Sequence, residues 1–357
     1  MHGDLLALPM HSPDETDNSR PQVQMQWPFA RDSRLRPCYL RGLAERTYKL
    51  VSRGGVEWVE CSRLARRRWI LHAFSTRRGG LSNAPTAGLN LGFTEPDIRA
   101  QVEENRKRFF ENLGASRFSL ATVRQVHSAQ VYLAARGVSG KLEYHLCGHP
   151  APEPACDRPP AGDALLTNQP GILLSVRTAD CLPILLADTR RRAVAAIHAG
   201  WRGALKRIVE KTVGEMRRLF ASRPGDLLAG LGPSIRACCY EVGEEVVEAF
   251  CGQFVHGETF FHKMLPAHPS AARREQNPHL FPSSAPPGHG SEAARTAHFD
   301  LVAVAREQLL SAGLCASSIQ VTDACTSCRT DLFYSHRKEG SRTGRMMAVI
   351  GIQPRVR

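Results

Sequence analysis

The sequence contains no run of about 18 or more apolar residues, so it has no segment long enough to cross a membrane as a helix. Its first residues also lack the apolar core of a secretory signal peptide, and we expect the chain to stay in the cytoplasm. The chain has eleven cysteines, an odd number without even spacing. Together with the missing export signal, this count favours reduced thiols over a disulfide framework.

Acidic residues are outnumbered by basic ones, which gives a formal net charge of +13 that comes mostly from arginine. A basic chain suggests nucleic acid as a partner. However, the arginines are scattered along the chain, and no basic motif interleaved with aromatic residues occurs. We therefore expect no nucleic-acid partner and no membrane partner. Binding of small anions such as phosphate, or a contribution to solubility alone, explains the charge equally well.

The chain has 357 residues, of which 42% are hydrophobic, which is adequate for a core. Residues 1–35 are polar and without periodicity, and they are typical of a disordered leader. Residues 36–357 are predicted to form a single domain. Two segments rich in Gly, Pro and His, near 136–162 and 256–298, are predicted to be loop insertions.

The most informative stretch is 172–203. It contains three apolar runs of strand length, at 172–176, 182–187 and 193–197. The polar segment 189–192 is short enough to turn the second strand back on the third. That hairpin would bring Cys181 close to His198. Elsewhere, apolar spacing predicts helices over 96–114 and 204–220, and alternating valines predict a strand around His127.

A thiol next to an imidazole suggests two kinds of chemistry. Cys181 and His198 with one further histidine would make a three-ligand metal site, in which zinc keeps an open fourth position for activating water or polarising a substrate oxygen. Copper accepts the same ligands, so the ligand types alone do not choose the metal. Alternatively, Cys181 is a nucleophile and His198 its general base.

A second group of cysteines has a recognisable spacing. Cys325 and Cys328 form a C-x-x-C pair. A second such pair would indicate a structural zinc site, and the sequence contains none. A thioredoxin-like redox role is a further possibility for the pair. Cys238 and Cys239 are adjacent, and we expect them to be inert.

Several motifs occur together in one order along residues 70–352. They are Phe74-Ser-Thr-Arg-Arg-Gly-Gly-Leu-Ser82, Leu89-Asn-Leu-Gly92, Gln125-Val-His127, Thr178-Ala-Asp-Cys-Leu-Pro183, His198-Ala-Gly-Trp-Arg-Gly203, Gly232-Pro-Ser-Ile235, Cys239-Tyr-Glu-Val-Gly243, Cys325-Thr326, Ser335-His-Arg337 and Gly344-Arg345. With these motifs the chain resembles the laccase-domain family. That family is also called the YfiH-type purine nucleoside phosphorylases and was formerly termed multicopper polyphenol oxidoreductases.

The resemblance implies an α/β (α+β) fold with a two-sheet core flanked by helices, like that of cytotoxic necrotising factor. It implies a metal site of His127, Cys181 and His198 that holds Zn²⁺, with Cu²⁺ as an alternative. The implied activity is phosphorolysis of the purine nucleosides adenosine, inosine and methylthioadenosine, with phosphate as co-substrate. Adenosine deamination is implied as an additional activity.

The matched turns supply candidates for the remaining roles. Arg77, Arg202 and Arg337 are candidate phosphate ligands, because guanidinium groups bind phosphate in a bidentate manner, and Asn90 is a further candidate for substrate binding. Asp180 has two open interpretations. It donates a proton to the leaving purine, or it accepts a hydrogen bond that orients a metal-binding histidine.

Two rival functions follow from the same residues. One is a metal-independent thiol hydrolase or peptidoglycan-editing enzyme that uses Cys181 and His198. The other is a copper-dependent polyphenol oxidase, which is disfavoured because the chain has no His-X-His pair of the kind that forms a trinuclear copper centre. The chain also departs from the resembled family. Its predicted insertions are longer, and His336 stands where an aromatic residue is common.

Overall fold

The computed structural model describes residues 47–148, 159–262 and 297–354, and within these ranges the strands form three sheets. The first sheet has six strands in the order β1-β2-β3-β16-β8-β4. Their bounds are Tyr48–Arg53 (β1), Val56–Cys61 (β2), Ile70–Ser75 (β3), Met346–Ile352 (β16), Ile172–Thr178 (β8) and Ser119–Thr122 (β4).

The second sheet has seven strands in the order β15-β11-β9-β10-β7-β5-β6. They are Ile319–Val321 (β15), Leu227–Leu231 (β11), Leu182–Asp188 (β9), Ala193–Ala199 (β10), Ala164–Thr167 (β7), Val131–Arg136 (β5) and Leu142–Leu146 (β6). A small third sheet has the order β12-β14-β13, with bounds Glu241–Val242 (β12), Ala297–Phe299 (β14) and Phe261–His262 (β13).

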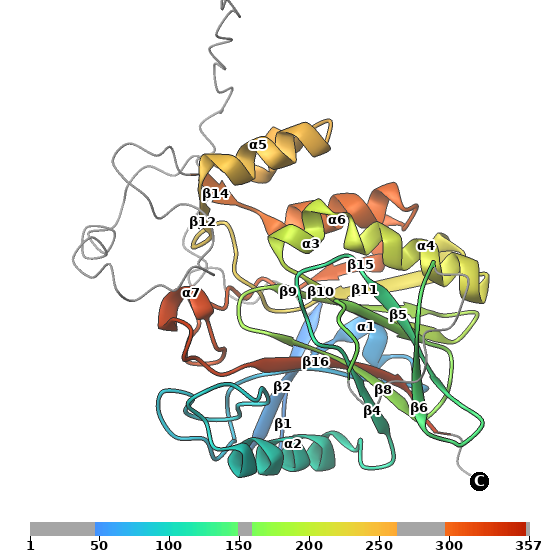
Figure 1. Ribbon diagram of the computed structural model, residues 1–357, viewed down its shortest axis with the longest axis vertical. Helices are drawn as coiled ribbons and strands as arrows, with labels where there is room; N and C mark the ends of the chain where they lie inside the picture. The colour runs from blue at the N-terminus through green and yellow to red at the C-terminus, as the bar shows by residue number, and fades with distance from the viewer. Residues whose placement is uncertain (1–46, 149–158, 263–296, 355–357) are drawn as a thin grey trace, which may run out of the picture. The chain divides into compact units, whose positions relative to one another are not determined.

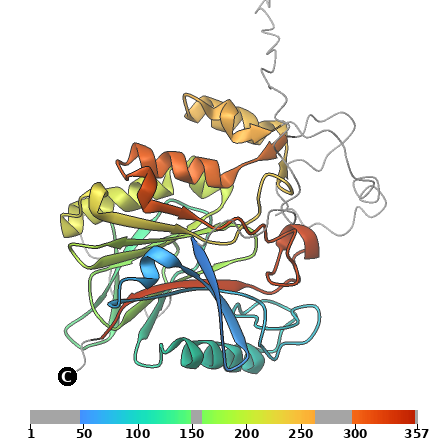
Figure 2. The ribbon, with the colours of Figure 1, turned by 180° about the vertical axis from the view of Figure 1, so that it is seen from behind.

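Helices cover the outer faces of the two large sheets (Figures 1 and 2). The α-helices are Ser62–Ala65 (α1), Arg99–Leu113 (α2), Trp201–Leu205 (α3), Ile208–Phe220 (α4), Glu244–Gln253 (α5), Leu301–Ser311 (α6) and His336–Glu339 (α7). Short 3₁₀ helices span Pro224–Asp226, Gly257–Phe260 and Ala316–Ser318. Helix α2 lies against the six-stranded sheet, whereas α4 and α6 lie on the seven-stranded sheet. None of the helices among the described residues is long and apolar enough to span a bilayer.

The main core lies between the two sheets. Every residue of β9 and β10 is buried, because one face of these strands meets the opposite sheet and the other face meets helices. The inner cluster joins Leu185 and Val194 of one sheet to Val176 and Ile350 of the other. These continuous apolar runs explain why the strands in 172–203 could be predicted from the sequence.

The predicted class, mixed α and β with a two-sheet core flanked by helices, is confirmed. So are the three strands of 172–203 and their hairpin turn, in which Arg192 N donates to Asp188 O. The predicted helix over 204–220 starts earlier and is interrupted, because Arg207 has a left-handed φ of 60° between α3 and α4.

Two loop predictions need correction. Segment 136–162 contains β6, which pairs with β5 and extends the seven-stranded sheet by a hairpin. Segment 256–298 contains the 3₁₀ helix at Gly257–Phe260, all of β13 and the start of β14. Residues 149–158 and 263–296 of these segments, and the leader predicted over 1–35, lie outside the described residues.

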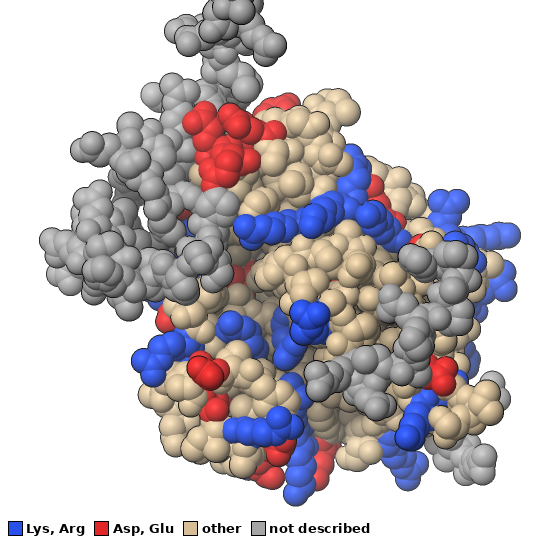
Figure 3. All heavy atoms as spheres, viewed as in Figure 1, with Lys and Arg blue, Asp and Glu red and all other residues tan. Residues whose placement is uncertain are grey.

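On one face of the molecule, positive side chains are dispersed and do not form a single patch (Figure 3). Figure 3 shows Lys and Arg side chains at many places on one face, with Asp and Glu side chains among them. This agrees with the scatter of arginines along the sequence.

Candidate functional site

The hairpin of β9 and β10 brings the first two site residues together. In its antiparallel register, His198 lies opposite Pro183 and Ala199 lies opposite Leu182. Cys181 immediately precedes β9 and therefore lies beside the end of β10 that carries His198. The sequence-based prediction that these two side chains meet at one end of the hairpin is confirmed.

His127 comes from the loop between β4 and β5, not from a strand as its flanking valines suggested. It has a left-handed φ of 55°, which is uncommon for a residue with a side chain. The turn is held by Asp163, whose carboxylate accepts hydrogen bonds from the backbone N–H groups of Val126, His127 and Ser128. This turn directs the imidazole of His127 toward Cys181.

Asp163 also binds the second histidine. Its Oδ1 accepts a hydrogen bond of 2.8 Å from Nδ1 of His198. Burial alone would raise the pKa of Asp163, but hydrogen bonds from His198 and Ser128 outweigh it and hold that pKa at about 2. The carboxylate is therefore ionised and acts only as an acceptor, so Nδ1 of His198 carries a proton and Nε2 is left to bind a ligand.

The donor atoms of His127, Cys181 and His198 all lie within 4.8 Å of one another. The Cys181 Sγ and the His127 Nε2 are 3.7 Å apart, close to the about 3.6 Å expected for sulfur and nitrogen on one tetrahedral zinc ion. Burial raises the pKa of the Cys181 thiol, but the two imidazoles outweigh it and lower that pKa. The donor set therefore fits a metal ion, because the thiolate is the metal-binding form.

Gly200 makes this close approach possible. A Cβ added at Gly200 would lie 2.7 Å from His127 Cδ2 and 3.1 Å from Cys181 Sγ. Both contacts are shorter than ordinary van der Waals distances, so only glycine leaves the two side chains where they are.

Asp180 does not orient a histidine, because Asp163 has that role. Its Oδ1 accepts from the Thr326 hydroxyl at 2.6 Å, and its Oδ2 accepts from the backbone N of Arg337 at 2.6 Å. Burial is the main cause that raises the pKa of Asp180 to about 6. Asp180 has a left-handed φ of 94°. It joins the turn before Cys181 to the loop that carries Thr326 and to the start of α7, which carries Arg337.

Arginine side chains lie close to Tyr240, Cys181 and Asp180. Arg337 lies over the ring of Tyr240, with its Cζ 5.4 Å from the ring centroid. Burial is the main cause of a raised Tyr240 pKa, and the charges of Arg337 and Arg202 act against it, so both arginines are near this hydroxyl. Arg345, which we did not predict as a site residue, lies close enough to Cys181 and Asp180 for their charges to raise its pKa against the lowering effect of burial.

Two predicted substrate ligands have structural contacts instead. Arg77 donates to the backbone oxygens of Ala87 and Thr330 and pairs with Glu339 at 2.6 Å, which uses most of its N–H groups. Asn90 is fully buried, and its Oδ1 accepts from the backbone N of Arg345 at 2.8 Å. Asn90 thus supports the segment that carries Arg345, and we no longer assign either residue a direct contact with substrate.

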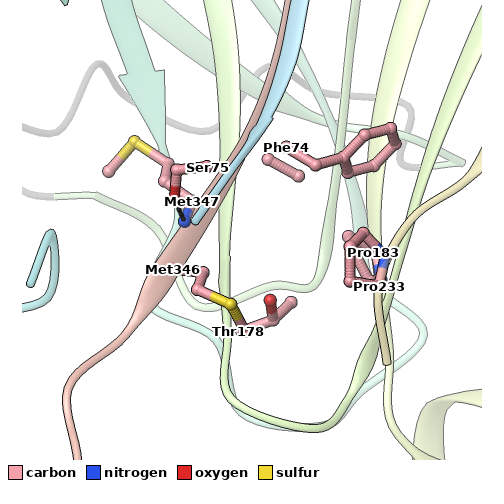
Figure 4. Close-up of a pocket in the computed structure, with 8 residues that line it drawn as sticks. Phe74, Ser75, Thr178, Pro183, Pro233, Met346 and Met347 are labelled. Carbon is pink, nitrogen blue, oxygen red and sulfur yellow. Dashed lines mark hydrogen bonds between the residues drawn. The ribbon is translucent and has the colours of Figure 1, made fainter. Parts of the chain in front are cut away.

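A small apolar hollow of about 170 Å³ lies between the ends of β3, β8 and β16 (Figure 4). It is lined by Phe74, Thr178, Pro183, Pro233 and Met346, among others, and the figure shows Ser75 Oγ accepting from the backbone N of Met347. None of the site residues lines it. We therefore assign the chemistry to the His/Cys group and not to this hollow.

Three residues of the site were not found by sequence reasoning. Asp163 follows a glycine and precedes the buried run of β7, a position that gives no direct signal of its partners. Tyr240 and Arg345 stand within motifs that resemble those of the family, but their spacing alone does not place them beside Cys181.

Comparison with known proteins gives a consistent result. A model of the family described as "Multi-copper polyphenol oxidoreductase laccase" matches residues 71–353. A protein of Deinococcus radiodurans named "Purine nucleoside phosphorylase" is 36% identical over 290 residues, which cover 80% of this chain and 90% of that protein. A protein named "Adenosine deaminase RL5", from an unknown prokaryotic organism, is 32% identical over 276 residues. These residues cover 77% of this chain and 91% of that protein.

Among solved structures, the crystal structure of YlmD from Geobacillus stearothermophilus matches with a TM-score of 0.66 at 29% sequence identity. The match covers 86% of this chain and 99% of that chain. The fold is therefore shared with a protein of known structure.

Proposed function

This chain belongs to the family described as multi-copper polyphenol oxidoreductase laccase, and we propose that it is a zinc-dependent purine nucleoside phosphorylase. The observation that carries the proposal is the convergence of His127, Cys181 and His198 on one point beside a group of arginines. The names of relatives that align with most of this chain support the same activity. We place the enzyme in the cytoplasm, where a thiolate ligand stays reduced.

We propose that His127 Nε2, Cys181 Sγ and His198 Nε2 hold the metal ion. Bound zinc with an open fourth position would supply Lewis-acid chemistry at this point. Asp163 keeps Nδ1 of His198 protonated and holds the turn that carries His127, so it orients both imidazoles at once. Copper is the alternative ion, since the same donors accept it.

The arginines supply the phosphate site in this proposal. In phosphorolysis, an oxygen of hydrogen phosphate bonds to the anomeric carbon of the ribose while the glycosidic C–N bond breaks. The purine leaves with the electron pair of that bond and gains the proton that hydrogen phosphate loses. Arg202 and Arg337 bind the phosphate through paired N–H groups. Asp180 fixes the backbone of Arg337, and Thr326 in turn fixes Asp180. The contacts of Asp180 therefore favour a positioning role over proton donation. The raised pKa of Tyr240 keeps its hydroxyl protonated at neutral pH, so this group can donate a hydrogen bond to substrate.

We propose adenosine, inosine and methylthioadenosine as substrates. These nucleosides share the purine ring and the anomeric carbon, and they differ at C6 of the purine and at the 5′ carbon of the ribose. Phosphorolysis changes only the shared glycosidic bond. One site can therefore act on all three if its essential contacts are to phosphate, anomeric carbon and purine.

Adenosine deamination is a second candidate activity. It is favoured by the similarity to the protein named adenosine deaminase RL5. The reaction replaces the C6 amino group with an oxygen from water and needs no phosphate. Product analysis therefore separates the two activities, because adenosine yields adenine by phosphorolysis and inosine by deamination.

The test is metal analysis of the purified protein, followed by chromatography of products from inosine and adenosine with and without phosphate. We expect bound zinc and phosphate-dependent release of hypoxanthine from inosine. The Cys181→Ala variant should lose the ion held by His127, Cys181 and His198, and with it both activities. The matched control is Cys315→Ala, which changes an exposed cysteine outside the site. Undiminished turnover by Cys181→Ala protein that has lost the ion of this site would refute the proposal.

The two rival functions have their own assays. A nucleophilic thiol would react with iodoacetamide in the untreated enzyme, whereas a zinc-bound Cys181 would be labelled only after a chelator has removed the metal. A copper oxidase would consume oxygen when the copper-loaded protein is given a phenol. We expect labelling only after chelation and no oxygen uptake.

A further inference from the structure

Four cysteines that are far apart in the sequence come together at one end of the seven-stranded sheet. Cys238 and Cys239 follow β11, and Cys325 and Cys328 follow β15. Their four sulfur atoms all lie within 4.8 Å of one another. The Cys328 Sγ is 3.6 Å from that of Cys238 and 3.4 Å from that of Cys239.

The fold itself explains the meeting. Strands β11 and β15 pair in parallel, so their chains leave the sheet at the same edge. The two loops then stay together, because Thr326 N donates to Ser234 O at 3.1 Å and Arg236 Nη1 donates to Thr322 O at 3.0 Å. Each loop closes into a turn that presents its two sulfurs to the other loop.

The spacing of the sulfurs selects the kind of ligand. Four thiolates around one tetrahedral zinc ion, with Zn–S bonds of 2.3 Å, are separated by about 3.8 Å. The observed 3.4 and 3.6 Å are close to this value and far longer than the about 2.05 Å of a disulfide bond. A single soft ion with tetrahedral preference suits this arrangement, and zinc is the usual occupant of four-cysteine sites.

We propose that Cys238, Cys239, Cys325 and Cys328 form a structural zinc site, separate from the group of His127, Cys181 and His198. With four protein ligands the ion has no open position, so it holds the two loops together and takes no part in the reaction. Two C-x-x-C pairs are the usual sequence signature of such a site, and this chain has only one. The structure instead combines one such pair with an adjacent pair.

The position of the site suggests what it supports. Cys239 is followed by Tyr240, and Cys325 is followed by Thr326, whose hydroxyl binds Asp180. An ion that joins the two turns would therefore fix the loops from which Tyr240 and Thr326 reach the candidate active site. This role rests on the proposed function, whereas the metal site itself does not.

The decisive experiment uses the Cys181→Ala protein, in which all four cysteines of the new site are unchanged. We expect it to retain about one zinc ion per chain, surrounded by sulfur only at about 2.3 Å in X-ray absorption. After exchange for cobalt(II), the spectrum should show the strong charge-transfer and visible bands of tetrahedral thiolate coordination. Absence of retained metal, or a shell of nitrogen and oxygen, would overturn the proposal.

Cysteine substitutions give the complementary test in the otherwise unchanged chain. We expect Cys328→Ser and Cys239→Ser each to lose about one metal ion per chain while keeping the ion at His127 and His198. Cys251→Ser, which changes a cysteine outside both groups, should keep both ions. Equal metal content in all three variants would contradict the proposal, and so would a disulfide among the four cysteines in freshly purified protein. Failure of phosphorolysis would leave these metal results unchanged, so the two proposals can fail separately.

Discussion

At the scale of single residues, Asp163 organises the candidate site more directly than Asp180. Its carboxylate binds the loop of His127 through backbone N–H groups and the ring of His198 through Nδ1. The sequence identified His127, Cys181 and His198 because their residue types already suggest metal binding. It did not identify Asp163, because an acceptor is recognised only by the groups that the fold brings to it.

The first prediction concerns this carboxylate. Asp163→Asn keeps the size of the side chain but removes the charge that holds His198 in one tautomer. We expect metal affinity to fall about 10- to 100-fold, measured by competition with a chelator of known affinity. Asp188→Asn is the matched control. Asp188 is also fully buried, but it caps the far turn of the β9–β10 hairpin through the N–H groups of Arg190 and Arg191. Equal losses of metal affinity in both variants would mean that changing any buried carboxylate has this effect, and that Asp163 has no specific role at the histidines.

The second prediction concerns Gly200. Its φ of −81° is allowed for any residue, so Gly200→Ala tests only the space that its side chain would take from His127 and Cys181. We expect activity to fall about 100-fold, because a displacement of about 1 Å is enough for such a loss. Gly214→Ala in α4 meets nothing within 4 Å and should keep activity and add up to about 1 kcal/mol of stability. Full activity of Gly200→Ala would show that His127 and Cys181 can be displaced without loss of activity.

At the scale of elements, the sequence predicts best the segments whose apolar pattern fits only one kind of secondary structure. The runs of β8, β9 and β10 are apolar throughout, and their ends carry the polar residues, so both strands and turn could be read from the sequence. His127 was placed in a strand because its neighbours are valines, whereas hydrogen bonds to Asp163 decide its local conformation. The break between α3 and α4 has no sequence signal either, since Arg207 is not a residue that favours a left-handed φ.

The third prediction concerns the junction of β2 and β3. His72 of β3 is buried, and its Nε2 accepts the N–H of Cys61 at the end of β2 at 2.9 Å. Burial lowers the pKa of His72 to about 4. As the pH falls, His72 therefore becomes protonated at a higher pH in the unfolded chain than in the folded one. The stability that His72 contributes is complete above the unfolded pKa near 6.5 and is lost as the pH falls to about 4, by about 3 kcal/mol.

Urea unfolding of the wild type and of His72→Gln, both with chelator, measures this effect. The glutamine oxygen can still accept the Cys61 N–H but does not titrate. Between pH 7 and pH 4, the free energy of unfolding of the wild type should therefore fall by about 3 kcal/mol more than that of His72→Gln. The raised pKa of Asp180 has the opposite effect in the same range, but it is present in both proteins and cancels. Parallel curves would exclude His72 as the titrating group.

At the scale of the whole molecule, the site lies where loops from both sheets meet. The turn between β8 and β9 crosses from one sheet to the other and carries Asp180 and Cys181, while His127 and His198 come from the ends of elements around it. The sequence could indicate which residues matter. It could not show which loops meet, because that depends on how the two sheets pack.

The last prediction separates the charge of the molecule from the charge of the site. The net charge of +13 is dispersed over the chain, whereas Arg202 and Arg337 act on one hydroxyl, that of Tyr240. If these two bind phosphate, the KM for phosphate should rise several-fold when ionic strength increases from about 0.01 to 0.1 M, as the Debye length falls from about 30 to 10 Å. The KM for inosine, a neutral substrate, should change little, and so should adenosine deamination.

Two variants that each lose one positive charge then show which charges cause the salt dependence of the KM for phosphate. Arg202→Gln should raise the KM for phosphate and flatten its dependence on salt. Arg190→Gln removes an equal charge at the far turn of the hairpin, where the side chain is 80% exposed, and should leave both unchanged. Equal effects of the two substitutions would mean that the field of the whole molecule attracts phosphate. An effect of Arg202→Gln alone means that phosphate binds at the start of α3, which follows His198 and lies next to the proposed metal ligands.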